Sequence, residues 1–67
     1  MRVELRSKLI DAASYEEDKR LLRIYMANGQ LREFVDVPRQ VFNDLAQAVS
    51  AGTYYVQNIK GRFPGAQ

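Results

Sequence analysis

Residues 38–52, PRQVFNDLAQAVSAG, decide the fold, because they predict the one substantial helix of the chain. Pro38 suits the first helical position, where its fixed φ is already helical and its missing N–H would have no partner. Asp36 stands just outside, where it can cap the helix or favour the positive end of its dipole. Gly52 stands where a left-handed residue would end the helix.

The apolar residues of this stretch fall on one side of the predicted helix. At about 100° per residue they occupy roughly 120° of its circumference, and polar residues fill the rest. The stripe consists of Val41, Phe42, Leu45, Ala48 and Val49. Such a helix has one buried face, so we expect it to cover a sheet formed by the residues that precede it.

Composition limits both the size of the molecule and its chemistry. With 67 residues there is room for one domain, and it contains no cysteine and no histidine. These absences remove disulfides, the usual metal ligands, and the nucleophile–histidine pairs of many hydrolases. We therefore expect no cofactor, no metal and no enzymatic activity. No apolar run approaches the ~20 residues of a membrane span, so a cytoplasmic protein with no membrane partner is expected.

The positive charge lies in the second half of the chain. The formal net charge is +2, and residues 1–36 carry seven basic against seven acidic side chains. Beyond them, Arg39, Lys60 and Arg62 face only Asp44. Two of these three cations flank Gly61, after the predicted helix, and this is where a weakly basic surface would lie.

Short strands are predicted before the helix. Residues 20–27, RLLRIYMA, alternate well, and residues 9–15 and 30–35 are the other two candidates. In the 9–15 strand, Ile10, Ala12 and Ser14 would share one face. Residues 1–8 are charged and lack a clear period, so they are either a frayed start or a further strand.

Asn28-Gly29 predicts a hairpin, since both residues tolerate a positive φ. A two-residue loop would place Leu31 and Val35 on the face of Leu22, Ile24 and Met26. A three-residue loop with a bulge at Gly29 would instead place Arg32 and Phe34 there. We favour the second register, because it buries the larger ring and leaves Glu33 outside.

After the helix, four apolar residues recur at helix-like intervals: Tyr54, Tyr55, Ile59 and Phe63. They predict a short helical turn over residues 54–60, which Pro64 and Gly65 terminate before a loose tail. The predicted fold is α+β. It has an antiparallel sheet of about three strands, one amphipathic helix across it, and a short closing helix.

At this point the chain resembles a known family. The resemblance is carried by SKLIDAASYEE (7–17), the apolar strand before Asn28-Gly29, VDVP (35–38), GTYY (52–55) and NIKGRFP (58–64). This order of motifs resembles the KTSC domain, named for the C-terminal extension of some lysyl-tRNA synthetases. The resemblance spans residues 7–64 and implies a small α+β domain of unestablished function. Arg32 and Val56 stand where family members often carry an aromatic residue and an asparagine.

Two kinds of function fit these residues, with RNA slightly ahead. The synthetase fusion in the family, together with basic and aromatic residues, suggests an accessory module that binds RNA weakly. Its candidate residues are Arg23, Tyr54, Tyr55, Lys60 and Arg62. A core position explains Tyr55 better than binding does, and an ordinary solvated surface explains the three cations better than binding does. The alternative is a protein-interaction module or a homodimer, formed through an open sheet face or edge.

Overall fold

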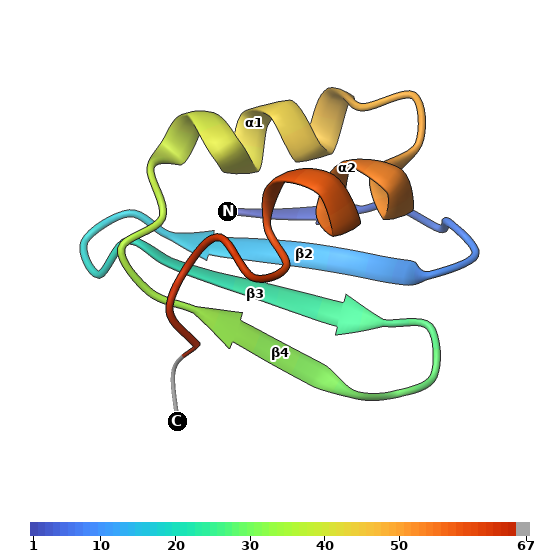
Figure 1. The fold of residues 1–67 in the computed structure, drawn as a ribbon, viewed down its shortest axis with the longest axis horizontal. Helices are drawn as coiled ribbons and strands as arrows, with labels where there is room; N and C mark the ends of the chain where they lie inside the picture. Colours follow the sequence, from blue (N-terminus) through green and yellow to red (C-terminus); the bar gives the residue numbers. More distant parts are fainter. Residues whose placement is uncertain (66–67) are drawn as a thin grey trace.

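The computed structural model describes residues 1–65, which form a four-stranded antiparallel sheet with two helices on one of its faces (Figure 1). The strands lie in chain order, and the elements are β1 (Arg2–Glu4), β2 (Ile10–Glu16), β3 (Leu21–Met26), β4 (Leu31–Phe34), α1 (Arg39–Gln47) and α2 (Ala51–Asn58). The predicted α+β class is confirmed. The sheet has one strand more than the three that were predicted, because the charged start of the chain pairs with β2.

The β3–β4 hairpin adopts the register that the sequence favours. Leu22 lies opposite Phe34 and Ile24 opposite Arg32, so the Phe34 ring faces the helices. The amide of Met26 donates to the carbonyl of Gln30 at 2.8 Å, which encloses a three-residue loop. Gly29 has φ 90°, a conformation that a residue with a side chain adopts only at a cost.

The face predicted for β2 is wrong beyond Ile10. The register shifts between Ile10 and Ala12, which leaves Asp11 as an extra residue. A bulge of this kind exchanges the faces that follow it. The inward-facing residues are therefore Ile10, Ala13 and Tyr15, all of which belong to the core.

The single helix predicted over residues 38–52 is in fact two helices. α1 ends at Gln47, and Ala48 is extended with φ −65° and ψ 141°. Ser50 then caps α2, its hydroxyl accepting from the amide of Thr53 at 3.3 Å. Gly52 lies in the first turn of α2 and terminates nothing. A Cβ added to Gly52 would lie 3.2 Å from that of Leu9, so the glycine permits α2 to approach the loop before β2.

The predicted cap of α1 is also wrong. Pro38 occupies the N-cap position itself, without a side-chain cap, and Asp36 has φ 58° in the bend that leads from β4 to the helix. Aspartate tolerates this left-handed conformation better than most residues do. Of the predicted stripe, Phe42 and Leu45 are buried, whereas Val49 is fully exposed because the helix ends before it.

The core lies between the sheet and the helices. Tyr15 connects the two layers, since its ring stacks on Phe42 with 5.7 Å between centroids and its hydroxyl donates to the carbonyl of Val37 at 2.6 Å. At the other end, Tyr55 of α2 packs edge-on against Phe34. Among residues 1–65, neither helix is long and apolar enough to cross a membrane.

The segment after α2 returns to the edge of β4. The amide of Val35 donates to the carbonyl of Pro64 at 2.9 Å, and Gly65 forms an isolated bridge with Phe34. The sequence predicts a loose tail here, but Pro64 and Gly65 are held by the backbone of β4. The remaining two residues of that predicted tail lie outside the described residues.

Candidate functional site

The face of the sheet opposite the helices is open (Figure 1). It carries three of the four side-chain ion pairs found within residues 1–65. Arg23 of β3 lies on this face between two carboxylates, with its Nε 2.8 Å from Glu33 and its Nη1 paired with Glu16. Hydrogen bonds to Glu33 and then to Glu16 raise the pKa of the Arg23 guanidinium. Arg23 is thus on the outer face, as predicted, and its charge is balanced there.

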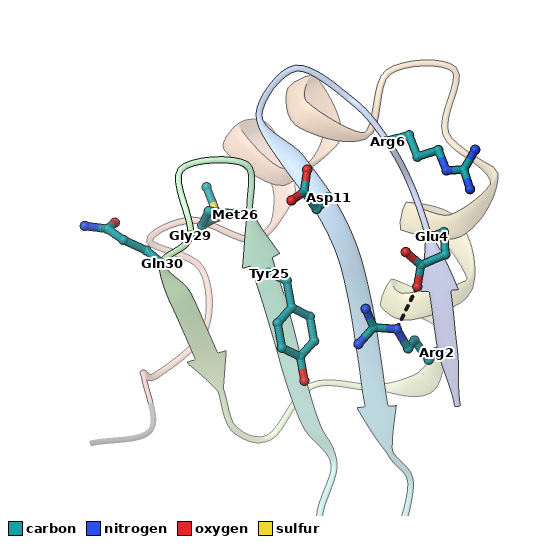
Figure 2. Close-up of a pocket in the computed structure, with 8 residues that line it drawn as sticks. All are labelled: Arg2, Glu4, Arg6, Asp11, Tyr25, Met26, Gly29 and Gln30. Carbon is teal, nitrogen blue, oxygen red and sulfur yellow. Dashed lines mark hydrogen bonds and ion pairs between the residues drawn. The ribbon is translucent and has the colours of Figure 1, made fainter.

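Next to this cluster the open face is hollowed (Figure 2). The hollow has a volume of about 420 Å³ and lies between β1, the bulge of β2 and the β3–β4 hairpin. It is lined by Arg2, Glu4, Arg6, Asp11, Tyr25, Met26, Gly29 and Gln30. Two cations and two anions line it, so the hollow is close to neutral while rich in hydrogen-bonding groups.

A stacked pair forms one wall of the hollow. The guanidinium carbon of Arg2 lies 4.8 Å from the centroid of the Tyr25 ring, within the range of a cation–π contact. The Nε of Arg2 donates to Glu4 at 2.7 Å, as Figure 2 shows. This hydrogen bond is the main cause of the raised pKa of Arg2. The pair offers a flat surface beside donors and acceptors, an arrangement suited to a planar polar ring.

The structure divides the five predicted site residues between separate places. Tyr55 is only 2% exposed, so its ring belongs to the core and is closed to a ligand. Tyr54 is half-buried, and burial followed by the charge of Asp44 raises the pKa of its phenol.

The predicted cations also lie apart. Lys60 and Arg62 are exposed in the turns after α2, on the helical side of the sheet. Arg23 lies on the other side. The five residues therefore do not form one site, and their role in binding stays a prediction.

Of the residues that line the hollow, sequence reasoning reached Tyr25 alone, which alternation along residues 20–27 places on the outer face beside Arg23. Arg2 and Glu4 lie in residues 1–8, for which the sequence allows either a frayed start or a strand. A signal was nevertheless present, since the first five residues, MRVEL, alternate strictly between apolar and charged. Asp11 reaches the rim because of the bulge, and neither composition nor periodicity indicates that bulge.

A second concavity lies on the helical side. It has a volume of about 450 Å³ and is lined by Ser7, Lys8, Leu9, Ser50, Gly52, Thr53, Val56 and Gln57. Leu9 and Val56 are exposed large apolar residues, as is Val49 next to the lining residue Ser50. We call this concavity the α2 groove. Its lining is more apolar than that of the hollow.

Comparison with known proteins places this geometry in a family. The KTSC domain model matches residues 6–63. A protein of Tsukamurella paurometabola is 33% identical over 57 residues, which cover 85% of each chain. The crystal structure of a KTSC domain protein from Yersinia pestis superposes with a TM-score of 0.92 and 27% identity, over 100% of this chain and 94% of the other. With matches over nearly the whole chain in both sequence and fold, this chain belongs to the KTSC domain family.

Proposed function

We propose that this chain is a non-catalytic accessory module that binds single-stranded RNA on the open face of its sheet. The observation that carries the proposal is the Tyr25–Arg2 stack beside the polar hollow. One established mode of single-strand recognition stacks bases on aromatic side chains of an open four-stranded sheet, and bases also stack on guanidinium planes. The comparison with that mode is an analogy, based on the similar arrangement of an aromatic side chain on an open four-stranded sheet.

The chemistry of the hollow supports a nucleobase as the ligand. A base edge carries both donors and acceptors, and the hollow supplies carboxylates at Glu4 and Asp11 and an amide at Gln30. Arg2 and Arg23 already have carboxylate partners. Their ability to attract phosphates is correspondingly reduced, so affinity should come mainly from stacking. We expect a shallower dependence on salt than a surface of unpaired cations would give.

The test is fluorescence anisotropy with labelled single-stranded RNA at two salt concentrations. Tyr25→Ala should weaken binding by about tenfold, since stacking of one base is worth roughly 1–3 kcal/mol. Tyr25→Phe keeps the ring and should bind as the wild type does. Absence of binding at low salt would refute the proposal. Equal binding by Tyr25→Ala, with loss in Lys60→Ala plus Arg62→Ala, would move the site to the other side of the sheet.

A second candidate function is a protein-interaction module that uses the α2 groove. Three of the exposed large apolar residues, Leu9, Val49 and Val56, gather there, and Lys8 supplies a cation at the lining. This surface fits a short acidic peptide with an apolar anchor. On a peptide array, Val56→Glu should lose such ligands while it leaves RNA binding unchanged. If Val56→Glu kept its peptide ligands and lost RNA binding, this candidate function would be excluded.

A further inference from the structure

The first five residues of the chain have a two-fold pattern. Met1, Val3 and Leu5 are apolar, and Arg2 and Glu4 carry opposite charges on either side of the centre. When such a strand meets an antiparallel copy of itself at Val3, each cation faces an anion and each apolar residue faces another. Opposite charges placed directly across a pair of strands are favourable and like charges are unfavourable, so this pattern favours pairing of the strand with a copy of itself.

The fold leaves this strand free to pair. β1 is at the edge of the sheet. Met1 and Tyr15 exchange both hydrogen bonds, at 2.8 and 3.0 Å, and the amide of Leu5 donates to Asp11. Hydrogen-bonded and non-hydrogen-bonded pairs alternate along an antiparallel ladder. The N–H and C=O groups of Arg2 and Glu4 therefore point away from β2, toward solvent.

We propose that two copies of this chain associate through their β1 strands about a two-fold axis at Val3. Arg2 then exchanges two backbone hydrogen bonds with the partner's Glu4, and symmetry supplies two more. Val3 lies against the partner's Val3 in the closely spaced, non-hydrogen-bonded position. Met1 lies against the partner's Leu5 on the same side.

Side-chain exposure agrees with this pairing. Met1 is 52% exposed, while Val3 and Leu5 are only partly covered by the core. The partner strand would cover these three apolar side chains on the helical side of the sheet. On the open side, the guanidinium of Arg2 already reaches a glutamate at 2.7 Å within its own chain. The partner's Glu4 provides a second carboxylate for it.

The other edge of the sheet does not favour self-pairing. Pro64 and Gly65 already occupy the backbone of β4 at Phe34 and Val35. Pairing of two β4 strands about Arg32 would place the two arginines opposite each other, which is unfavourable. Charged residues on an edge strand commonly prevent association with other chains. On β1 the charged residues would disfavour pairing with other strands but would pair with those of a second copy of β1.

Pairing through β1 would join both four-stranded sheets into one, with the two open faces side by side. The inference shares Arg2 and Glu4 with the surface proposed to bind a base. Association is measured on the protein without RNA, so the two proposals can fail separately. The contact involves few residues, and small interfaces are typically weak. We expect association that depends on concentration.

Sedimentation velocity over a range of concentrations tests the proposal. The wild-type mass should rise from 7.7 kDa toward twice that value. Glu4→Arg and Arg2→Glu each place like charges opposite one another, so each alone should associate at least about tenfold more weakly. Mixed in equal amounts, the two variants should form a heterodimer, because opposite charges then face each other at both pairs.

Arg39→Glu is the matched control, because it reverses the charge of an exposed arginine that has its own glutamate partner, Glu17, and lies outside β1. It should associate as the wild type does. Circular dichroism establishes that each variant is folded, and recovery of association in the mixture excludes simple damage to β1. A wild type that stays monomeric at the highest concentration overturns the proposal. So does a dimer that persists in both single variants.

Discussion

The hydroxyl of Tyr15 provides the sharpest test of how the two layers are held together. It donates to the carbonyl of Val37 at 2.6 Å, and the donor and acceptor are 22 positions apart in the chain. Tyr15 is 2% exposed and Val37 is fully buried. Tyr15→Phe keeps the ring and its stack on Phe42 but leaves a buried carbonyl without a partner. An unsatisfied buried group of this kind costs about 1–3 kcal/mol.

We therefore expect Tyr15→Phe to lower the free energy of unfolding by about 2 kcal/mol. A domain of this size has roughly 3–10 kcal/mol of stability, so the loss is a large share of the total. In thermal unfolding followed by circular dichroism, Tm should fall by about 8–16 °C. The urea midpoint should fall with an unchanged slope, because the same surface is exposed on unfolding.

Tyr55→Phe is the matched control for this experiment. Tyr55 is equally buried at 2%, but its hydroxyl makes no hydrogen bond within residues 1–65. Its loss should change stability by less than about 0.5 kcal/mol. Equal effects of the two substitutions would refute the reasoning, since hydroxyl removal itself would then explain both. A Tyr15→Phe protein as stable as the wild type would show that the Val37 carbonyl finds another partner at no cost.

Three further predictions concern the pH response, the core and the hairpin. The pKa of Tyr54 is raised in the folded protein, so its contribution to stability is fully present below the unfolded pKa of about 10. This contribution is lost as pH rises through the higher folded pKa. Urea midpoints at alkaline pH should therefore fall more for the wild type than for Tyr54→Phe. Phe42→Ala removes a buried ring stacked on Tyr15 and should cost about 3–5 kcal/mol in urea unfolding, whereas a loss below 1 kcal/mol would mean that the layers repack. Gly29→Ala should cost about 1 kcal/mol at φ 90° and Gly29→Asn less, and equal thermal stabilities of both variants and the wild type would contradict the left-handed turn.

The parts of the fold that follow from local chemistry could be predicted from the sequence. Asn28-Gly29 and the alternation of β3 indicate the hairpin, and the size of Phe34 favours its register. The break between α1 and α2 could not be predicted in this way. Residues 46–51, AQAVSA, contain no strong helix breaker, and the break depends on the Ser50 cap and on the approach of Gly52 to Leu9. That approach is a tertiary contact, which overrides local propensity.

The bulge of β2 was hidden for a different reason. The strand sequence IDAASYE is rich in small residues, so neither face is clearly apolar, and a shift at Asp11 leaves little trace in the pattern. The same shift decides which residues reach the hollow. Arg23 could be placed on the outer face by alternation. Its two carboxylate partners could not, because Glu16 and Glu33 belong to neighbouring strands whose registers had to be known first.

The strand order β1-β2-β3-β4 is also the order of synthesis, and this has a consequence for the nascent chain. Each strand can pair with the one made just before it, so the sheet requires only local closures of the kind that form quickly. Its apolar face, by contrast, has no cover until α1 and α2 emerge, since both helices follow all four strands. A chain truncated before residue 39 would thus have an uncovered apolar sheet face, and exposed apolar surface of this kind is prone to aggregation.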